Sequence, residues 1–459
     1  MGFVKGSVIM TCSPFVHVLS GSERGKRCDQ CFRRSDELRK CSKCKVTWYC
    51  NIECQRTAWE LHKKECKCLM KHSPKIPTES VRLLLKLCHR FNEGDDVEHL
   101  DAPGIRSFAD FKSHIDDIKK DDTKVGHFRQ LYFTLRTFTD GIMKLPTTLE
   151  ISEIFARMCI NSFNILDSEM QSIGVGIYLS ASIFDHSCEA NAVVVFSGTS
   201  LEVHALTDID HEDYKRIYIS YTEILAPHSE RYDELMNQYY FRCDCERCLD
   251  DSLDQLMLST KCTENGCPGP VIEYEVGDFR CTYCNKTSFD DSYRLKKQIS
   301  INRTKEALVK IDDTRKEGEY EECLQLVEEC LETYEEILHG LNVYYLRLMD
   351  RGFDACIFTE DWKGAHQYAL KSLPGYLRLY PRYHPSLGLQ LLRLGKLELH
   401  LQIYDEGERH LEQAQDILRI THGKQHTIYD EIDFIVNKCK VDKVAQFCQK
   451  VNTEIHELD

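Results

Sequence analysis

The strongest constraint on the fold is a run of eight metal-binding side chains within residues 28–66. A structural zinc ion takes four Cys or His ligands, so eight ligands fill two tetrahedral sites with none left over. The stretch is too rich in lysine and cysteine to build a core of its own, and bound metal would supply its folding energy. The sequence therefore predicts two zinc ions, held by Cys28, Cys31, Cys41, Cys44, Cys50, Cys54, His62 and Cys66.

The second half of this run, YCNIECQRTAWELHKKEC at 49–66, reads as a helix. Cys50 and Cys54 are four residues apart, as are His62 and Cys66, so each pair would face one side of a helical turn. Spacing alone shows eight ligands and does not divide them between the two ions.

A second cysteine group lies at 239–248, YYFRCDCERC. Its three thiolates, Cys243, Cys245 and Cys248, are one short of a closed structural zinc site. The fourth ligand could come from anywhere in the chain, and Cys188 is the attractive candidate.

A third group has the layout of a small zinc ribbon, in which two cysteine pairs stand beside turn-forming residues with a short hairpin between them. Its ligands are Cys262, Cys267, Cys281 and Cys284. Four zinc ions would then use 15 of the 24 cysteines. The other nine are expected to be small core residues: Cys12, Cys68, Cys88, Cys159, Cys323, Cys330, Cys356, Cys439 and Cys448.

Composition supports metal rather than disulfides. The 459 residues allow about three domains, and neither a signal peptide nor a membrane-spanning apolar run is recognisable. A cytoplasmic and nuclear protein without a membrane partner is expected, and in such reducing compartments a high cysteine count points to metal. The net charge of −15 argues against a protein that coats nucleic acid, although residues 24–67 carry 13 Lys/Arg against six Asp/Glu. Residues 317–336 hold nine Glu and no Lys or Arg, and are read as a solvated helix face.

The carboxy-terminal part, from about residue 300, is predicted to be a helical repeat array. Tyr320, Trp362 and Tyr404 recur at intervals of 42 residues. Three positions after each comes a small residue, Cys323, Ala365 or Gly407, as helices that cross closely require, and His384 and His426 are also 42 apart. Stacked helix pairs of this kind form a solenoid.

A polar motif before a valine strand, IFDHSCEANAVVVF at 183–196, is the clearest functional signal. Asp, His, Cys and Asn are either satisfied turn formers or the lining of a site. Tyr218 and Tyr221, in RIYISY at 216–221, are by residue type more often strand residues than catalytic groups.

Taken together with CINSF at 159–163, GVGIYLSASIFDHSCEAN at 174–191, and the WYC and HKKEC of the first cysteine run, these motifs resemble the SET- and MYND-domain (SMYD) protein-lysine methyltransferases, and most of all their SMYD3-like subgroup. The resemblance covers nearly the whole chain. It implies an α+β fold with a SET-type β-rich core, an inserted MYND zinc finger, a cysteine-rich post-SET zinc site, a zinc ribbon and an all-α TPR-like C-terminal solenoid.

The implied domains follow the chain in order. They are a truncated N-terminal SET remnant (1–27), the MYND finger (28–66), a helical SET insertion (67–150), the SET core (151–242), the post-SET cysteine site with the zinc ribbon (243–290) and the TPR-like repeats (291–459). In the family the last domain folds over the SET cleft and limits substrate access; a plain stabilising scaffold is the equal alternative.

The resemblance also implies functional residues. In the finger it pairs Cys28, Cys31, Cys50 and Cys54 on one ion and Cys41, Cys44, His62 and Cys66 on the other. The polar motif would form a pseudoknot that builds the pocket for S-adenosylmethionine. There Asn161 and His186 would contact the donor, Phe241 would stack near its adenine, Tyr221 would be the active-site tyrosine, and Cys188 would complete the zinc site of Cys243, Cys245 and Cys248.

The chemistry suits these residue types. Methyl transfer to an amine is an in-line displacement, so the protein mainly aligns donor and acceptor. The substrate lysine must arrive neutral, which a narrow apolar channel favours by lowering its pKa. Tyr221 can place a hydroxyl at the reacting centre, while Tyr218, Phe163 and Phe241 can supply aromatic walls.

Partners follow from the same resemblance. They are histone or other lysine-containing protein substrates and, at the finger, proline-rich peptides. Weak contact with DNA is permitted by the basic side chains Arg33, Arg34, Arg39, Lys40, Lys43 and Lys45.

Three departures from the family pattern favour a second reading. The Gly-rich donor-binding turn is missing from the 27 residues before Cys28, Asp185 replaces the usual Asn, and Ala109 and Lys112 stand where relatives offer donor-binding polar groups. A carboxylate only accepts hydrogen bonds, whereas an amide also donates. The two hypotheses are a lysine methyltransferase and a catalytically impaired adaptor that binds partners through the finger and the repeats.

Overall fold

The computed structural model describes residues 2–94, 97–100, 104–275 and 277–456, with side chains left out at 97–100, 104–105 and 447–456. The chain divides into two compact units. The first comprises Met1–Ile219 and Glu234–Arg242, and the second comprises Ser220–Asp233 and Cys243–Asp459. Within the described residues, no helix is both long and apolar enough to cross a membrane.

Two three-stranded antiparallel sheets organise the first unit, with strand orders β1-β11-β10 and β2-β8-β7. Their strands are β1 (Val8–Cys12), β2 (Val16–Leu19), β7 (Ser162–Leu166), β8 (Ser172–Ile177), β10 (Ala192–Ser197) and β11 (Ser200–Ala205). The valine-rich stretch after the polar motif forms β10 as predicted, and its Ala192, Val195 and Phe196 are buried.

Shorter strand pairs complete this unit: β3 (Arg39–Lys40) with β4 (Trp48–Tyr49), β5 (Val97–Leu100) with β6 (Gly104–Ser107), and β9 (Asp185–His186) with β12 (Tyr218–Ile219). The last pair is parallel. It therefore lays the polar motif beside the RIYISY segment, although about thirty residues separate them in sequence.

The helices of the first unit are α1 (Ile52–His72), α2 (Glu79–Glu93), α3 (Ile115–Ile118), α4 (Asp122–Thr139) and α5 (Thr148–Asn161), and α6 (His228–Tyr239) runs across the division between the units. Single 3₁₀ turns are η1 (Gly21–Glu23), η2 (Phe108–Asp110), η3 (Ala181–Ile183) and η4 (Tyr214–Arg216).

The predicted helix at 49–66 is wrong for its first three residues. Tyr49 pairs with Arg39 in the β3–β4 hairpin, and the Asn51 side chain accepts a hydrogen bond from the backbone N–H of Cys54, so α1 begins at Ile52. An Asn in this position satisfies a backbone donor that a new helix would leave unpaired. Cys50 therefore reaches its site from a turn, whereas Cys54, His62 and Cys66 project from α1.

The finger shares its core with the helices that follow it. Leu84 of α2, Leu135 of α4 and Phe155 of α5 are buried in one cluster with the finger cysteines Cys28 and Cys66. This shared core explains how a cysteine- and lysine-rich finger buries apolar surface in addition to binding metal.

The second unit begins with α7 (Glu246–Leu249), α8 (Ser252–Met257) and the predicted ribbon hairpin. Its strands, β13 (Thr260–Lys261), β14 (Pro270–Glu275) and β15 (Asp278–Cys281), form one antiparallel sheet. Val271 and Phe279 make a small core against Phe289 and Tyr293, so the ribbon packs on the start of the next helix.

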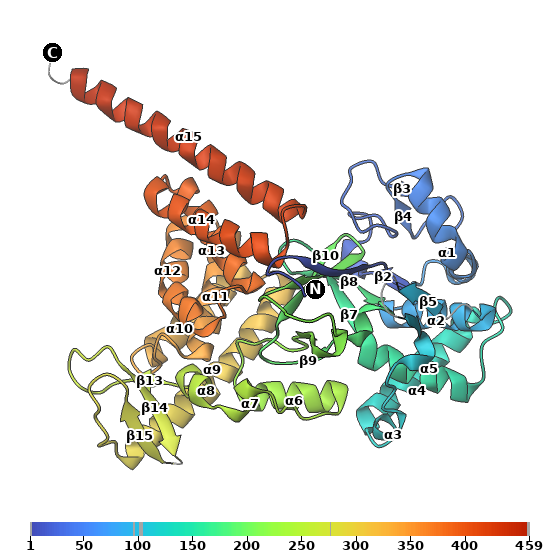
Figure 1. Ribbon diagram of the computed structural model, residues 1–459, viewed down its shortest axis with the longest axis horizontal. Helices are drawn as coiled ribbons and strands as arrows, with labels where there is room; N and C mark the ends of the chain where they lie inside the picture. Colours follow the sequence, from blue (N-terminus) through green and yellow to red (C-terminus); the bar gives the residue numbers. More distant parts are fainter. Residues whose placement is uncertain (1, 95–96, 101–103, 276, 457–459) are drawn as a thin grey trace. The chain divides into compact units, whose positions relative to one another are not determined.

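The rest of the unit is the predicted helical array, in which consecutive helices lie side by side (Figure 1). Its helices are α9 (Asp291–Glu317), α10 (Tyr320–Tyr334), α11 (Val343–Phe358), α12 (Trp362–Leu379), α13 (Pro385–His400), α14 (Tyr404–Thr421) and α15 (Thr427–His456). The three aromatic residues of the 42-residue repeat each begin a helix, Tyr320 in α10, Trp362 in α12 and Tyr404 in α14.

The recurring small residues lie at close helix crossings. Cys323 and Ala365 are at most 1% exposed. At Gly407 an added Cβ would come within 3.3 Å of the Cβ of Glu398, on the preceding helix α13.

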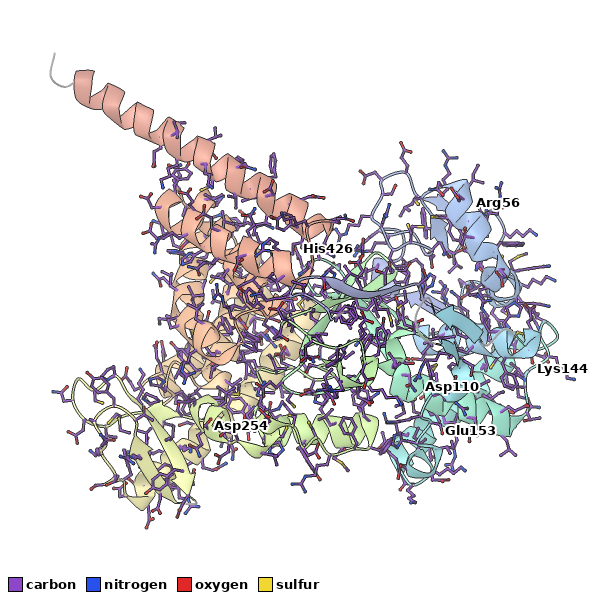
Figure 2. All side chains as sticks on the ribbon, viewed as in Figure 1. Arg56, Asp110, Lys144, Glu153, Asp254 and His426 are labelled. Atoms are coloured by element: carbon purple, nitrogen blue, oxygen red, sulfur yellow. The ribbon has the colours of Figure 1, made fainter. Side chains whose placement is uncertain are left out.

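The recurring histidines are helix caps. His384 Nδ1 accepts the backbone N–H of Ser386 at 3.2 Å, and His426 Nδ1 accepts that of Ile428 at 3.2 Å (Figure 2 labels His426 where α15 begins). Asn342, a further 42 residues back, caps α11 in the same way with its side-chain oxygen. Each of the three repeats thus has a side-chain hydrogen-bond acceptor at the residue that caps the helix, although the residue is Asn in one repeat and His in the other two.

The cysteines outside the four groups behave largely as predicted. Cys159 is half-buried, the side chain of Cys448 lies outside the described residues, and the other seven are buried.

Candidate functional site

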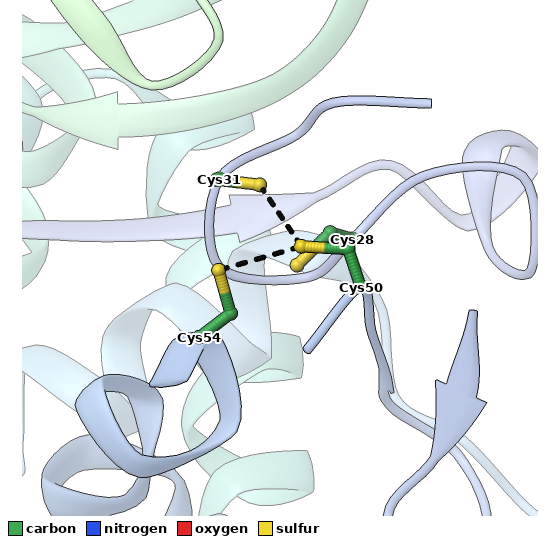
Figure 3. A group of neighbouring side chains, drawn as sticks. All are labelled: Cys28, Cys31, Cys50 and Cys54. Carbon is green, nitrogen blue, oxygen red and sulfur yellow. Dashed lines mark hydrogen bonds between the residues drawn. The ribbon is translucent and has the colours of Figure 1, made fainter. Parts of the chain in front are cut away.

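The structure brings Cys28, Cys31, Cys50 and Cys54 together, with all four sulfur atoms within 4.8 Å of one another (Figure 3). Cys31 Sγ lies 3.8 Å from Cys50 Sγ, and Cys50 Sγ lies 3.5 Å from Cys54 Sγ. Four convergent thiols with no counter-charge among them match the donor set of a structural zinc site. We call these four residues the first finger site.

Cys41, Cys44, His62 and Cys66 converge in the same way, all four are buried, and they form the second finger site. His62 Nε2 lies 3.5 Å from Cys44 Sγ, so this nitrogen faces the cysteines. The other ring nitrogen, Nδ1, is 2.9 Å from the Glu65 carboxylate. The division of the eight ligands into two sets is the one that the family resemblance implies.

The same backbone turn recurs at three of the cysteine pairs. Phe32 (φ 58°), Lys45 (φ 60°) and Asn285 (φ 59°) each follow the second cysteine of a C-x2-C pair and adopt the left-handed conformation. Each donates its backbone N–H to the carbonyl of the first cysteine, at 2.9, 3.0 and 3.1 Å. This conformation is strained for Phe and Lys, and its repetition indicates that the turn is held for its effect on the cysteines.

The ribbon forms the third complete set, with the sulfur atoms of Cys262, Cys267, Cys281 and Cys284 within 4.8 Å of one another. Its hairpin supplies Cys281 at the end of β15. The chemistry of three complete sets, two with four thiols and one with three thiols and an imidazole, fits zinc.

In the second unit Cys243, Cys245 and Cys248 also lie together. The Arg231 guanidinium donates a hydrogen bond to Cys248 Sγ at 3.9 Å. Cys188 belongs to the first unit, where it is 2% exposed, and its role as the fourth ligand stays a prediction.

Two of the residues predicted to contact a methyl donor, Asn161 and His186, are connected through Lys112 in the first unit. Asn161, the last residue of α5, donates from Nδ2 to the backbone carbonyl of Lys112 at 3.0 Å and to that of Arg157 at 2.8 Å. Lys112 Nζ in turn lies 3.9 Å from the carboxylate of Asp185, which precedes His186 in β9.

His186 lies next to a group of aromatic rings. Its ring centroid is 5.9 Å from that of Phe241, and Phe241 is 6.4 Å from Tyr239. His186 Nε2 is 3.2 Å from Cys188 Sγ, so the two predicted residues of the polar motif touch. The aromatic face of the half-buried Phe241 suits stacking with a purine ring. The side-chain amide of Asn161 suits a hydrogen bond with a polar group of the same ligand.

Asn191, at the end of the polar motif, holds the two crossing segments together. Its Oδ1 accepts the backbone N–H of Tyr218 at 2.8 Å, and its Nδ2 donates to the carbonyl of Arg216 at 3.1 Å. In the same crossing, the Ser187 N–H donates to the Ile219 carbonyl at 3.1 Å. The polar motif indicated a functional site from sequence alone. The bridging role of Asn191 could not be predicted, because it depends on the pairing of β9 with β12.

The aromatic residues predicted to form the walls belong to different elements of the chain. Phe163 makes an edge contact with the buried Tyr178 at 5.7 Å, whereas Tyr218 is half-buried on β12. Tyr221 is half-buried at the start of the second unit, and its catalytic role stays a prediction.

The structure describes the residues of two of the three departures from the family pattern. Lys112 and Asp185 are 76% and 65% exposed, so their ion pair is weak and both remain accessible to a ligand. Ala109 lines a cavity of about 480 Å³ with mostly apolar neighbours, among them Phe15 and Phe108.

Comparison with known proteins identifies the family. Residues 28–66 match the model of the MYND finger. The histone-lysine N-methyltransferase SMYD3 of Homo sapiens is 31% identical over 438 residues, which cover 95% of this chain and 92% of the relative. The chain belongs to the SMYD family. The N-lysine methyltransferases SMYD2-A of Danio rerio (29%) and SMYD2 of Homo sapiens (28%) also match, each over 94% of this chain and 92% of its own length.

Membership of the SMYD family confirms the α+β architecture with its zinc finger and helical carboxy-terminal part. It leaves unexplained a buried ion network behind the finger, which the sequence did not reveal. Glu65 and Arg82 are 1% and 2% exposed and joined at 2.7 Å. Burial raises the pKa of Glu65, but the charges of Arg82 and Lys86 and the hydrogen bond from His62 together lower that pKa well below its usual value. The one available signal was the position of Glu65, three residues after a ligand on the same helix.

Proposed function

We propose that this chain is an S-adenosylmethionine-dependent protein-lysine N-methyltransferase that acts on histone or other protein lysines. The observation that carries the proposal is the contact series Asn161–Lys112–Asp185 beside the His186–Phe241 ring pair. It gathers three segments that resemble the donor-binding parts of SMYD proteins into one place in the first unit.

S-adenosylmethionine supplies the activated methyl group when bound. Asn161 and His186 would hold its polar parts, and Phe241 would stack on the adenine. Tyr221 would orient the lysine amine with its hydroxyl, and aromatic side chains around the lysine would exclude water and favour the neutral amine. Asn191 positions the RIYISY segment through its bond to the Tyr218 N–H.

Calorimetric titration of the zinc-loaded, full-length chain with S-adenosylmethionine tests this proposal. We expect saturation near one site, loss of binding in His186→Ala, and no change in His127→Ala, which removes an exposed histidine of the same unit. Transfer of a labelled methyl group to histones or to a lysine-containing protein mixture then tests the reaction. Saturable binding that survives His186→Ala would contradict the residue assignment.

A specific observation also favours the adaptor hypothesis. The carboxylate of Asp185, 3.9 Å from Lys112 Nζ, stands where the family has an amide. A folded, zinc-loaded chain that binds no donor would contradict the methyltransferase hypothesis and leave the adaptor hypothesis.

We also propose that the finger binds proline-rich peptides, and that the chain works in the cytoplasm and the nucleus. Lys40 lies over the Trp48 ring at 4.7 Å and Lys43 over the Trp59 ring at 5.3 Å, so the finger carries two aromatic rings with their cations. Aromatic surfaces suit proline-rich segments. Tryptophan fluorescence on adding a proline-rich peptide tests the idea, and a salt-dependent response to DNA instead would point to the basic side chains.

A further inference from the structure

The two ring nitrogens of His62 contact different groups: Nε2 contacts Cys44 Sγ and, at 3.1 Å, Thr47 Oγ1, whereas Nδ1 contacts Glu65. Nε2 faces the cysteines of the second finger site, while Nδ1 is 2.9 Å from Glu65 Oε2. If Nε2 binds a metal, Nδ1 carries the proton and donates to Glu65. A carboxylate in this position fixes the tautomer and the ring orientation of a histidine ligand and raises its basicity.

Glu65 is itself held from outside the finger. Its other oxygen, Oε1, accepts a hydrogen bond from Arg82 Nε at 2.7 Å, and Arg82 lies on α2, beyond the 28–66 stretch that matches the family model. Both side chains are at most 2% exposed. A buried ion pair loses much of its value when one partner is removed, because the other charge is left uncompensated.

Arg82 also reaches toward the first finger site. Its guanidinium lies 3.6 Å from Asp29, which sits between the ligands Cys28 and Cys31. Asp29 Oδ2 accepts the backbone N–H of Trp48 at 2.8 Å, which fastens the segment that leads to Cys50. One arginine thus lies between the carboxylate behind the second finger site and the loop of the first.

We propose that Glu65 and Arg82 are positioning residues for the zinc sites of the finger: Glu65 orients His62 in the second finger site, and Arg82 couples that site to the loop of the first. The finger of this chain is then completed by α2 and is not a self-contained metal module. The proposal does not depend on methyltransferase activity.

The test uses the full chain loaded with ¹¹³Cd in place of zinc and followed by ¹¹³Cd NMR. Of the three complete sets, the second finger site alone contains a nitrogen ligand, so its resonance is separated from those of the tetrathiolate sites. The ribbon site, formed within the second unit, is the internal reference. Metal loss is measured for each resonance on titration with a chelator.

We expect Glu65→Gln to weaken metal binding at the second finger site about 10- to 100-fold, the range that loss of an outer partner of a ligand produces. The first finger site and the ribbon should be unchanged. Arg82→Gln should weaken both finger sites and leave the ribbon intact. Glu60→Gln and Arg90→Gln, which alter a partly exposed ion pair between the same two helices, are the matched controls.

Arg82→Lys serves if the other variants fail to fold, because it keeps the charge and removes the branched guanidinium; a weaker but equally selective loss is expected. The ¹⁵N shifts of the His62 ring report the tautomer directly, and a change in them is not produced by general destabilisation. Unchanged metal binding at the second finger site in Glu65→Gln, or equal losses at the finger and the ribbon, would overturn the proposal.

Discussion

Arg393 on α13 forms an ion pair with Asp354 on α11, and both residues lie 42 positions after Arg351 and Asp312, which form the same pair between α11 and α9. The interval is that of the repeated helix starts. Asp354 also forms an ion pair with Arg315 of α9 at 3.2 Å. These three ion pairs connect α9, α11 and α13, and we call them the ladder. The 42-residue period therefore applies to paired charged side chains as well as to buried residues.

The ladder should contribute measurably to stability. Arg351→Gln and Arg393→Gln are each expected to lower the free energy of unfolding by about 0.5–1 kcal/mol, because the pairs are partly exposed and screened by solvent. Chemical denaturation followed by circular dichroism measures the change. Arg303→Gln, which removes a pair whose two side chains are 65% exposed, is the control and should cost less. Equal costs at all three positions would show that the ladder has no special role.

The cap histidine His384 should make the solenoid sensitive to acid. Burial and the nearby charge of Arg247 lower the pKa of His384 to about 3. Between about pH 6.5 and pH 3 the unfolded chain binds a proton that the folded chain does not, so stability falls with falling pH, by as much as about 1.4 kcal/mol for each pH unit.

His384→Asn copies the cap that Asn342 provides one repeat earlier and cannot titrate in this range. We expect the variant to keep its stability at about pH 7.5 and to lose less than the parent chain at about pH 5.5, below the ordinary pKa of histidine. Urea unfolding at both pH values, with zinc present, measures the difference. A parallel loss in the two proteins would mean that His384 does not control the acid response.

Asp185→Asn should restore the amide that the family pattern has at this position. An amide can donate to an acceptor on S-adenosylmethionine, and one such hydrogen bond is worth about 0.5–1.5 kcal/mol, or roughly a two- to tenfold gain in affinity. Calorimetry gives the dissociation constants, and Asp210→Asn controls for the change in net charge. Weaker binding by Asp185→Asn would indicate instead that the carboxylate attracts the cationic donor.

Tyr221→Phe should separate methyl transfer from donor binding. Removing the hydroxyl is expected to lower the rate of methyl transfer about 100-fold, since a small misplacement of reacting groups has an effect of this size. Affinity for S-adenosylmethionine should change little. Labelled-methyl transfer under single-turnover conditions measures the rate, with Tyr232→Phe on α6 as the control. Full activity in Tyr221→Phe would remove this residue from the mechanism.

The Cys and His clusters of the finger and the ribbon, and the helical repeats, were predictable from sequence because local spacing determines them. The C-x2-C pairs are closed by turns of a few residues, as at Phe32 and Lys45. The 42-residue period places Tyr320, Trp362 and Tyr404 at helix starts, where each repeat meets only its neighbours. The start of α1 was misjudged because Tyr49 is drawn into a hairpin with Arg39, a pairing that helix spacing does not reveal.

The sequence by itself determined the Cys and His sets of the finger and the ribbon, the repeat period and the family resemblance of the polar motif. Only the tertiary structure decided that β9 meets β12 in parallel, that Asn191 fastens this crossing, and that Arg82 reaches Glu65 from another helix. The reason is physical: ligand spacing acts over a few residues, and each helical repeat packs only against its neighbours in sequence. The burial of an ion pair depends on which distant segments exclude water from it.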